Sequence, residues 1–211
     1  MMSKIRIEHL LDWLDASYPW DNQCYLAYSQ PWQLLVATIL SAQCTDDRVN
    51  QVTPVFFGKY PTLESIASAD IASIEDYIRS TGFYHMKAKY IKGSAQAILT
   101  QHDGVLPSDI ESLTALPGVG RKTANVLRGH VFGIPSIVVD THVARVSRRI
   151  GLTKYTDPHR IEMELMEVLP QTHWIKYNHQ IIAHGRKVCK SRKPRCESCG
   201  LAQMCPSAGK S

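Results

Sequence analysis

Apolar residues recur every three or four positions along most of this chain, which is the spacing of a helix with one buried face. The run from Trp32 to Leu40 is apolar on all sides, so we predict a fully buried helix that Pro31 opens. The only β-like run covers residues 134–139 and has no partner strand. The pattern therefore predicts an all-helical protein, with helices over residues 5–14, 32–40, 46–60, 71–79, 87–101, 109–115, 160–169 and 174–187.

Short polar residues mark the expected starts of several helices, because their side chains accept hydrogen bonds from unpaired backbone N–H groups. Asp46 or Asp47 is expected to cap the helix that runs towards residue 60. Asp157 followed by Pro158 is typical of a capped helix start. Asp140 ends the apolar run 137–139 and precedes Thr141, so we expect it to cap a helix as well.

The composition agrees with a folded, core-bearing protein of one large or two small domains. The chain has 211 residues, of which 44% are hydrophobic and 20% charged, so disorder is excluded as its main state. The most apolar stretch, residues 32–40, is about half the roughly 20 residues that a bilayer span needs. Residues 1–6 have no apolar core of a signal peptide, and we expect a cytoplasmic protein with no membrane contact.

Charge is distributed unevenly between the two halves of the chain. Residues 1–85 hold five Lys/Arg and ten Asp/Glu, a net charge of −5. Residues 86–211 hold 19 basic and nine acidic residues, a net charge of +10. This asymmetry suggests that a polyanion faces the C-terminal half, although a solvated basic surface alone would look the same.

Four of the six cysteines cluster near the C-terminus, and this spacing indicates a metal site. In the cytosol such clustering favours metal over disulfides, and both zinc and an iron–sulfur cluster accept four thiolates. The long first spacer and the Cys205-Pro206 pair favour iron–sulfur. Cys24 and Cys44 have no neighbouring ligand and are expected to be buried thiols. The clustered residues are Cys189, Cys196, Cys199 and Cys205, at spacing C-x6-C-x2-C-x5-C.

The segment 116–124 lies between two helical patterns and predicts a helix–hairpin–helix. Gly118 and Gly120 allow a tight turn whose backbone N–H groups, with the positive end of the next helix, would bind a phosphate regardless of base sequence. An ordinary helix–helix turn is the plainer interpretation of two such glycines. Arg121 and Lys122, directly after the turn, favour DNA. The residues expected at this DNA contact are Leu116, Gly118, Val119, Gly120 and Arg121.

Two residues near the hairpin have side chains suited to catalysis. Lys122 falls in the first turn of a helix, where the helix dipole disfavours the ammonium and favours the neutral, nucleophilic amine. Asp140 follows apolar residues that could carry its carboxylate into an interior cleft. Taken singly, a phosphate-binding lysine and a helix-capping aspartate are the more ordinary explanations of these residues.

Four motifs together resemble the endonuclease III family of DNA glycosylases and AP lyases. They are LPGVGRKTAN at 116–125, VDTHV at 139–143, LSAQCTD at 40–46 and the cysteine tail. Their order and spacing match from about residue 30 to residue 206. The resemblance implies a six-helix barrel over residues 24–134, an iron–sulfur cluster domain over residues 1–23 and 135–211, and DNA in the cleft between them.

The resemblance also implies roles for individual residues. Lys122 would be the nucleophile and Asp140 would assist its deprotonation and stabilise the cationic sugar. Gln43 would fill the gap that a flipped base leaves, and Phe83 would wedge the opposite strand. The four cysteines would hold a [4Fe-4S] cluster. Thr114 and the segment 128–130 depart from the usual pattern near the base pocket, which leaves the preferred lesion open.

The loop between the first two clustered cysteines is strongly basic. Six positive charges fall within residues 186–195, four of them between Cys189 and Cys196, and Pro194 stiffens the chain. A loop of this kind is suited to binding phosphates, whereas a solvated loop is the plainer alternative. The basic residues expected to contact DNA are Lys190, Arg192, Lys193 and Arg195.

We therefore expect a monomeric base excision repair enzyme that removes oxidised pyrimidines from duplex DNA and cleaves AP sites. Two alternatives stay open at this point. One is a monofunctional mismatch or adenine DNA glycosylase, which the presence of Lys122 disfavours. The other is a non-enzymatic iron–sulfur module that binds DNA or senses redox state, in which Lys122 would only contact phosphate.

Overall fold

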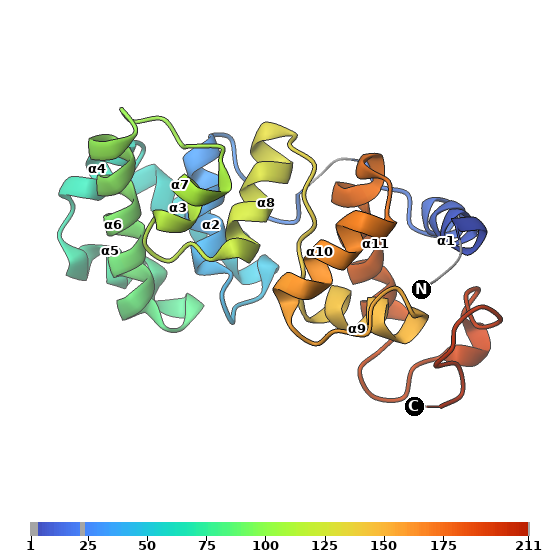
Figure 1. Ribbon diagram of the computed structural model, residues 1–211. Coiled ribbons are helices and arrows are strands. Elements are labelled where there is room, and N and C mark those ends of the chain that lie inside the picture. The colour runs from blue at the N-terminus through green and yellow to red at the C-terminus, as the bar shows by residue number, and fades with distance from the viewer. Residues whose placement is uncertain (1–3, 22–23, 211) are drawn as a thin grey trace. The chain divides into compact units, whose positions relative to one another are not determined.

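The chain forms two compact units, which we describe from a computed structural model covering residues 4–21 and 24–210 (Figure 1). Residues 24–134 form the first, here called the continuous unit. The second, here called the composite unit, combines the described N-terminal residues with residues 135–210. The described residues contain helices and loops and no β-strand, so the predicted all-helical class is confirmed.

The continuous unit is built around one buried helix. Helix α2, Pro31–Leu40, buries every residue from Leu34 to Leu40, as its apolar sequence predicts. Six further helices contribute apolar residues to the same core, and with one 3-10 turn they complete the unit (Figure 1). They are α3 (Asp46–Lys59), α4 (Leu63–Ser68), α5 (Ile71–Ile78), the 3-10 turn η1 (Arg79–Thr81), α6 (Tyr84–Gln101), α7 (Ile110–Ala115) and α8 (Arg121–Phe132).

Three local predictions in this unit need correction. The cap of α3 is Thr45, whose Oγ1 accepts from the N–H of Arg48 at 3.3 Å, so the predicted Asp46 and Asp47 lie in the first turn instead. Helix α4 was not predicted, because six residues are too few to show a period. Helix α6 begins at Tyr84, three residues before the predicted start.

The composite unit packs helices from both ends of the described chain. They are α1 (Lys4–Ser17), α9 (Thr141–Ile150), α10 (Pro158–Val168), the 3-10 turn η2 (Gln171–His173), α11 (Trp174–Lys187) and the 3-10 turn η3 (Cys196–Ser198). Asp157 caps α10 as predicted, with its Oδ1 accepting from Arg160 N at 2.9 Å. The run 134–139 forms neither a helix nor a strand. In the core, the Tyr177 hydroxyl lies 2.7 Å from Ser147 Oγ.

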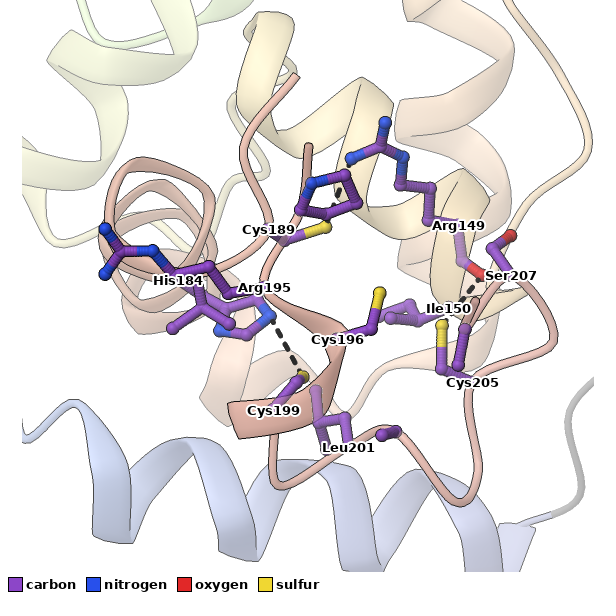
Figure 2. A pocket seen from close by; sticks show the side chains of 14 residues that line it. Arg149, Ile150, His184, Cys189, Arg195, Cys196, Cys199, Leu201, Cys205 and Ser207 are labelled. Carbon is purple, nitrogen blue, oxygen red and sulfur yellow. Dashed lines mark hydrogen bonds between the residues drawn. The ribbon is translucent and has the colours of Figure 1, made fainter. Parts of the chain in front are cut away.

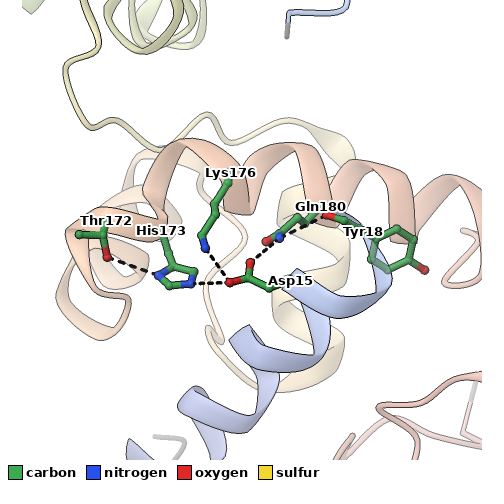
Figure 3. Close-up of polar contacts among 6 residues, drawn as sticks. All are labelled: Asp15, Tyr18, Thr172, His173, Lys176 and Gln180. Atoms are coloured by element: carbon green, nitrogen blue, oxygen red, sulfur yellow. Dashed lines mark hydrogen bonds and ion pairs between the residues drawn. The ribbon is translucent and has the colours of Figure 1, made fainter. Parts of the chain in front are cut away.

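Polar contacts join α1 to α11 around Asp15 (Figure 3). Lys176 Nζ donates to Asp15 Oδ2 at 2.6 Å, and Gln180 Nε2 donates to Oδ1 at 2.7 Å. His173 Nε2 lies 3.3 Å from the same carboxylate. Burial acts to raise the pKa of Asp15, but the hydrogen bonds from Lys176 and Gln180 outweigh it and hold that pKa below its ordinary value.

Among the described residues, no helix has both the length and the apolar character needed to cross a membrane.

Candidate active site and cysteine loop

The glycine hairpin between α7 and α8 depends on Gly118. Its φ of 78° is left-handed, and a Cβ there would lie 2.7 Å from the Tyr90 ring carbon Cγ, so a side chain is excluded on both counts. The turn closes with Val119 N donating to Leu116 O at 3.1 Å. Gly120 has φ −90° and open space around it, so its conformation does not demand glycine.

The apolar residues of the hairpin anchor it to the core. Leu116 is 2% exposed and Val119 6%, and both belong to the core of the continuous unit. The sequence predicts that both residues contact DNA. Because their side chains are buried, such a contact would be made by their backbone atoms. The exposed backbone of Gly118 and Gly120 lies beside them.

Lys122 lies in the first turn of α8, as the sequence predicts. Gly120 is the N-cap residue of α8 and has no side chain. The first N–H groups of α8 therefore receive no side-chain cap from it. Arg121 is half-buried, whereas the Lys122 side chain is exposed. The described residues include no hydrogen bond or ion pair to the Lys122 ammonium. The hairpin thus presents an amine beside a turn suited to phosphate binding.

Asp140 is the N-cap of α9, which confirms the capping prediction. Its Oδ1 accepts from Val143 N at 2.7 Å, and the carboxylate is half-buried after the buried residues 136–138. Among the described residues, no hydrogen bond or ion pair engages Oδ2 of Asp140. Burial lowers the pKa of the neighbouring His142, and the Asp140 charge acts against this. His142 Nδ1 lies 3.1 Å from Arg145 Nη2.

The two predicted base-flipping residues share an unusual backbone conformation. Gln43 has φ 55° and Phe83 has φ 50°, although side chains rarely adopt the left-handed region. Both side chains are exposed, and that of Phe83 is 64% exposed despite its apolar ring. Strained conformations of this kind concentrate at functional sites, where the surrounding structure holds them.

The four clustered cysteines line one cavity (Figure 2). All four are free and half-buried, and Ile150 and Leu201 contribute apolar walls. Among the described residues, no three His, Cys, Asp or Glu side chains converge closely enough to hold a single metal ion. Four thiols around one cavity are a donor set that suits a cluster with one iron for each thiolate.

Hydrogen bonds from α9 and α11 support this cavity. Arg149 Nη1 donates to Cys189 Sγ at 3.5 Å, and its backbone carbonyl accepts from Cys205 Sγ at 3.3 Å. His184 Nε2 lies 3.8 Å from Cys199 Sγ, and its Nδ1 lies 3.0 Å from the Tyr18 hydroxyl. Burial lowers the pKa of His184 to about 4, so the ring is neutral.

Two arginines of α9 hold the backbone of the cysteine loop, and the sequence analysis missed them. Arg145 Nη2 donates to the carbonyls of Gly185 and Cys189 at 3.2 and 3.0 Å. Arg149 donates to the carbonyls of Lys190 and Ser191 at 2.6 and 3.0 Å. Their spacing of four residues, which puts both on one helix face, was the available signal.

The basic loop presents its cations outwards. The loop returns to its start through Arg195 N, which donates to Val188 O at 3.1 Å. Lys193 has a left-handed φ of 50°. The exposed side chains are those of Lys190, Arg192, Lys193 and Arg195, the four predicted to contact DNA.

The residues that depart from the expected pattern occupy different environments. Thr114 is exposed, and its hydroxyl donates to Ile110 O at 2.8 Å within α7. Gly129 is buried in α8, and Tyr28 donates to the carbonyl of His130 at 3.0 Å. Cys24 and Cys44 are half-buried and pack against the core, and burial raises the pKa of the Cys24 thiol.

Comparisons with known proteins agree on one family. Residues 36–171 match the HhH-GPD superfamily of base excision DNA repair proteins. An endonuclease III from Synechocystis is 52% identical over 206 residues, covering 97% of this chain and 94% of that protein. An endonuclease III from Bacillus subtilis is 41% identical over the same shares. The structure of a trapped endonuclease III–DNA covalent intermediate superimposes with a TM-score of 0.92 at 40% identity, covering 99% of this chain and 98% of that one.

Proposed function

The chain belongs to the HhH-GPD superfamily of base excision DNA repair proteins, and from this premise we propose how its residues remove a damaged base and cut the strand. It is a DNA glycosylase with AP lyase activity. The finer proposal is that its substrates are oxidised pyrimidines in duplex DNA and preformed AP sites. It acts as a monomer in the cytoplasm and is associated with the nucleoid through DNA.

The exposed amine of Lys122 at the start of α8 is the observation that carries the proposed mechanism. Lys122 Nζ attacks C1′ of a flipped nucleotide, and the glycosidic bond breaks with its electron pair leaving on the base. The C1′–O4′ bond then opens to give an imine between lysine and sugar. A relative has been captured as a covalent DNA intermediate, which supports such a nucleophile. Flipping is required because C1′ is out of reach inside the stack.

Cleavage of the strand follows from the imine. Conjugation with C=N makes a 2′ proton acidic, and its loss expels the 3′ phosphate by β-elimination. Water then hydrolyses the imine and restores Lys122. Asp140 accepts the lysine proton before attack and stabilises the positive charge that develops on the sugar. The capping bond uses one carboxylate oxygen, and the charge of the whole group remains available for these roles.

DNA is gripped in two chemically different ways in this proposal. The Gly118 turn offers backbone N–H groups to phosphate, with Arg121 beside it. Lys190, Arg192, Lys193 and Arg195 offer cations. Cys189, Cys196, Cys199 and Cys205 would hold a [4Fe-4S] cluster, which supplies a structural cross-link for the basic loop when bound.

Borohydride reduction tests the nucleophile directly. Wild-type protein incubated with abasic duplex DNA should become covalently linked, and peptide mapping should place the link at Lys122. Lys122→Gln should abolish the link while retaining most DNA affinity, because one lost charge costs far less than a lost nucleophile. Trapping of Lys122→Gln at the wild-type rate would place the nucleophile elsewhere.

Lys59→Gln is the matched control for this experiment. Lys59 is an exposed lysine of the same unit, but it lies in the last turn of α3, where the helix dipole favours the ammonium. It should trap at the wild-type rate. A panel of duplexes with oxidised pyrimidines, oxidised purines and adenine mispairs then tests the substrate class. Excision of mispaired adenine faster than of oxidised pyrimidines would instead favour the alternative of a monofunctional adenine glycosylase.

A further inference from the structure

A lysine is buried in the continuous unit, on the inner side of α6. Lys87 is 3% exposed, although lysine is among the residues least often buried. Burial lowers its pKa below the ordinary value. The ammonium is held by two backbone carbonyls, with Nζ donating to Leu40 O and to Thr81 O at 2.8 Å each. The free-energy cost of burying this ammonium is small only while both carbonyls remain in place to accept its hydrogen bonds.

Each of these two carbonyls lies directly before a turn that carries one of the predicted base-flipping residues, Gln43 or Phe83. Leu40 is the last residue of α2, and the turn that follows it carries Gln43. Thr81 ends η1, and the next turn carries Phe83. Carbonyls at helix ends lack intrahelical partners and attract cations, so both are natural acceptors for an ammonium. Leu40 and Thr81, which are 41 residues apart in the sequence, thus meet at one nitrogen atom.

Lys87 also holds the far side of the Phe83 turn. Its backbone N–H donates to Phe83 O at 3.1 Å, so Lys87 bonds to carbonyls on both sides of Gly82. Gly82 and Phe83 both have left-handed φ values, of 70° and 50°. Because a non-glycine residue leaves this region unless its surroundings hold it, the bonds from Lys87 fix a conformation that the chain would otherwise relax.

We propose that Lys87 is a positioning residue for strand separation, which sets the turns of Gln43 and Phe83 relative to each other so that both side chains enter the duplex together. Lys87 acts through these two residues and does not touch DNA. This inference rests on the proposed function, since it assigns Gln43 and Phe83 the task of filling the gap and wedging the opposite strand.

The test compares Lys87→Met with Lys92→Met on three duplexes. Methionine keeps most of the apolar stem and removes the ammonium. Lys92 is the matched control, because it lies on the same helix and its Nζ donates to Ala69 O at 2.7 Å, away from both turns. The duplexes carry an oxidised pyrimidine in a stable pair, the same lesion mispaired, or a preformed abasic site. The readouts are single-turnover excision and the fluorescence of 2-aminopurine next to the lesion, which reports unstacking.

Lys87→Met should slow excision of the paired lesion on the order of tenfold, because small misplacement of separating groups is costly. The mispaired lesion should lose less, since unstacking it costs less. Cleavage at the abasic site should stay within about twofold, and the unstacking signal should fall in step with excision. Lys92→Met should match the wild type throughout. Equal losses on all three duplexes, or equal losses in both variants, would overturn the inference.

A double-mutant cycle separates positioning from a general loss of structure. In a Gln43→Ala/Phe83→Ala background, Lys87→Met should cost almost nothing further, because the groups it positions are gone. An additive loss there would contradict the inference. If Lys87→Met does not fold, Lys87→Gln, whose amide still donates to one carbonyl, takes its place in the same comparison. A wild type that neither excises nor traps would refute the proposed function itself, whereas only variant behaviour bears on Lys87.

Discussion

The two units of this protein are stabilised by different physics. The continuous unit surrounds α2, a helix with seven successive buried residues, and most of its buried residues are apolar, with polar side chains such as Lys87 spread over several helices. The composite unit has a smaller core, and its helix α11 buries Asn178, His179, Gln180 and His184. Each buried polar group needs a partner in the right place. The first unit therefore depends mainly on apolar burial, and the second depends more heavily on matched polar contacts.

The difference continues into how each unit prepares for DNA. The continuous unit offers strained turns and a glycine hairpin fixed to an apolar core, at Gln43, Phe83 and Gly118. The composite unit offers a cationic loop with little regular structure, held by arginines of α9 and by the cysteine cavity. The core and the bonds from Lys87 hold the strained turns of the continuous unit, whereas the loop of the composite unit depends on a cross-link. Four variants test this contrast.

Cys199→Ser should have the largest effect, and the composite unit should bear it. We expect wild-type protein purified anaerobically to carry about four irons per chain. The variant should lose the iron and much of its solubility, because metal binding is folding free energy for a loop of this kind. Limited proteolysis of the full chain should then cut within residues 135–210 and spare residues 24–134.

Cys44→Ser is the control for the cysteine prediction, because Cys44 is also half-buried but packs against the core of the other unit. It should keep its iron. Stoichiometric zinc without iron in the wild type would contradict the cluster assignment. Proteolysis spread evenly over both units of Cys199→Ser would contradict the contrast between them.

Asp140→Asn should have the next largest effect, on chemistry and not on folding. Asparagine caps helices about as well as aspartate, so stability should change little. Loss of the carboxylate charge should slow base release on the order of 100-fold. Cleavage of a preformed abasic site should fall far less, because its aldehyde has no base to expel. Single-turnover assays on the two substrates measure this difference.

Asp157→Asn provides the matched control, since Asp157 caps α10 of the same unit with the same geometry. It should leave both reactions unchanged. If Asp140→Asn and Asp157→Asn behave alike, Asp140 is only a cap.

The contrast between the units also explains what the sequence could predict. Apolar periodicity specifies α2 and the other helices of the continuous unit, because a buried face leaves a repeating pattern. It misses α4, which is too short to show a period, and it misses the roles of Arg145 and Arg149. Contacts of these arginines run to backbone carbonyls some 40 residues away, and carbonyls leave no trace in a sequence.

The candidate site shows the same limit. Motif spacing was enough to single out Lys122, Asp140 and the cysteines, whose chemistry depends on residue type. The buried sides of Leu116 and Val119 and the left-handed turns at Gln43 and Phe83 depend on tertiary packing. Nothing local distinguishes Lys87 from an exposed lysine of α6, since its partners are carbonyls that only the fold brings near.

Asp15→Asn should weaken the composite unit modestly. The carboxylate is partly exposed, so we expect the loss of its contacts with Lys176 and Gln180 to cost about 1 kcal/mol or less. Because the pKa of Asp15 is lowered on folding, its contribution is present above the unfolded pKa and is lost as the pH falls through the folded value. Chemical unfolding should therefore show the wild-type advantage at pH 7 and its disappearance in acid, below the ordinary pKa of an aspartate. A difference that persists there would exclude this ion pair as its source.

Lys193→Asn should have the smallest effect and bears on how the two units grip DNA. Asparagine tolerates the left-handed φ of 50° better than most residues, so the substitution removes the charge without adding strain. If Lys193 contacts phosphate, affinity should fall about equally for damaged and undamaged duplexes, and the slope of log affinity against log salt should drop by roughly one. Lys59→Asn, an exposed charge in the last turn of α3, should leave that slope unchanged. Binding titrations at several salt concentrations measure both variants. A loss of affinity confined to one lesion would mean that the basic loop reads bases. The loop would then not act through charge alone, and its contrast with the hairpin, which offers N–H groups, would be wrong.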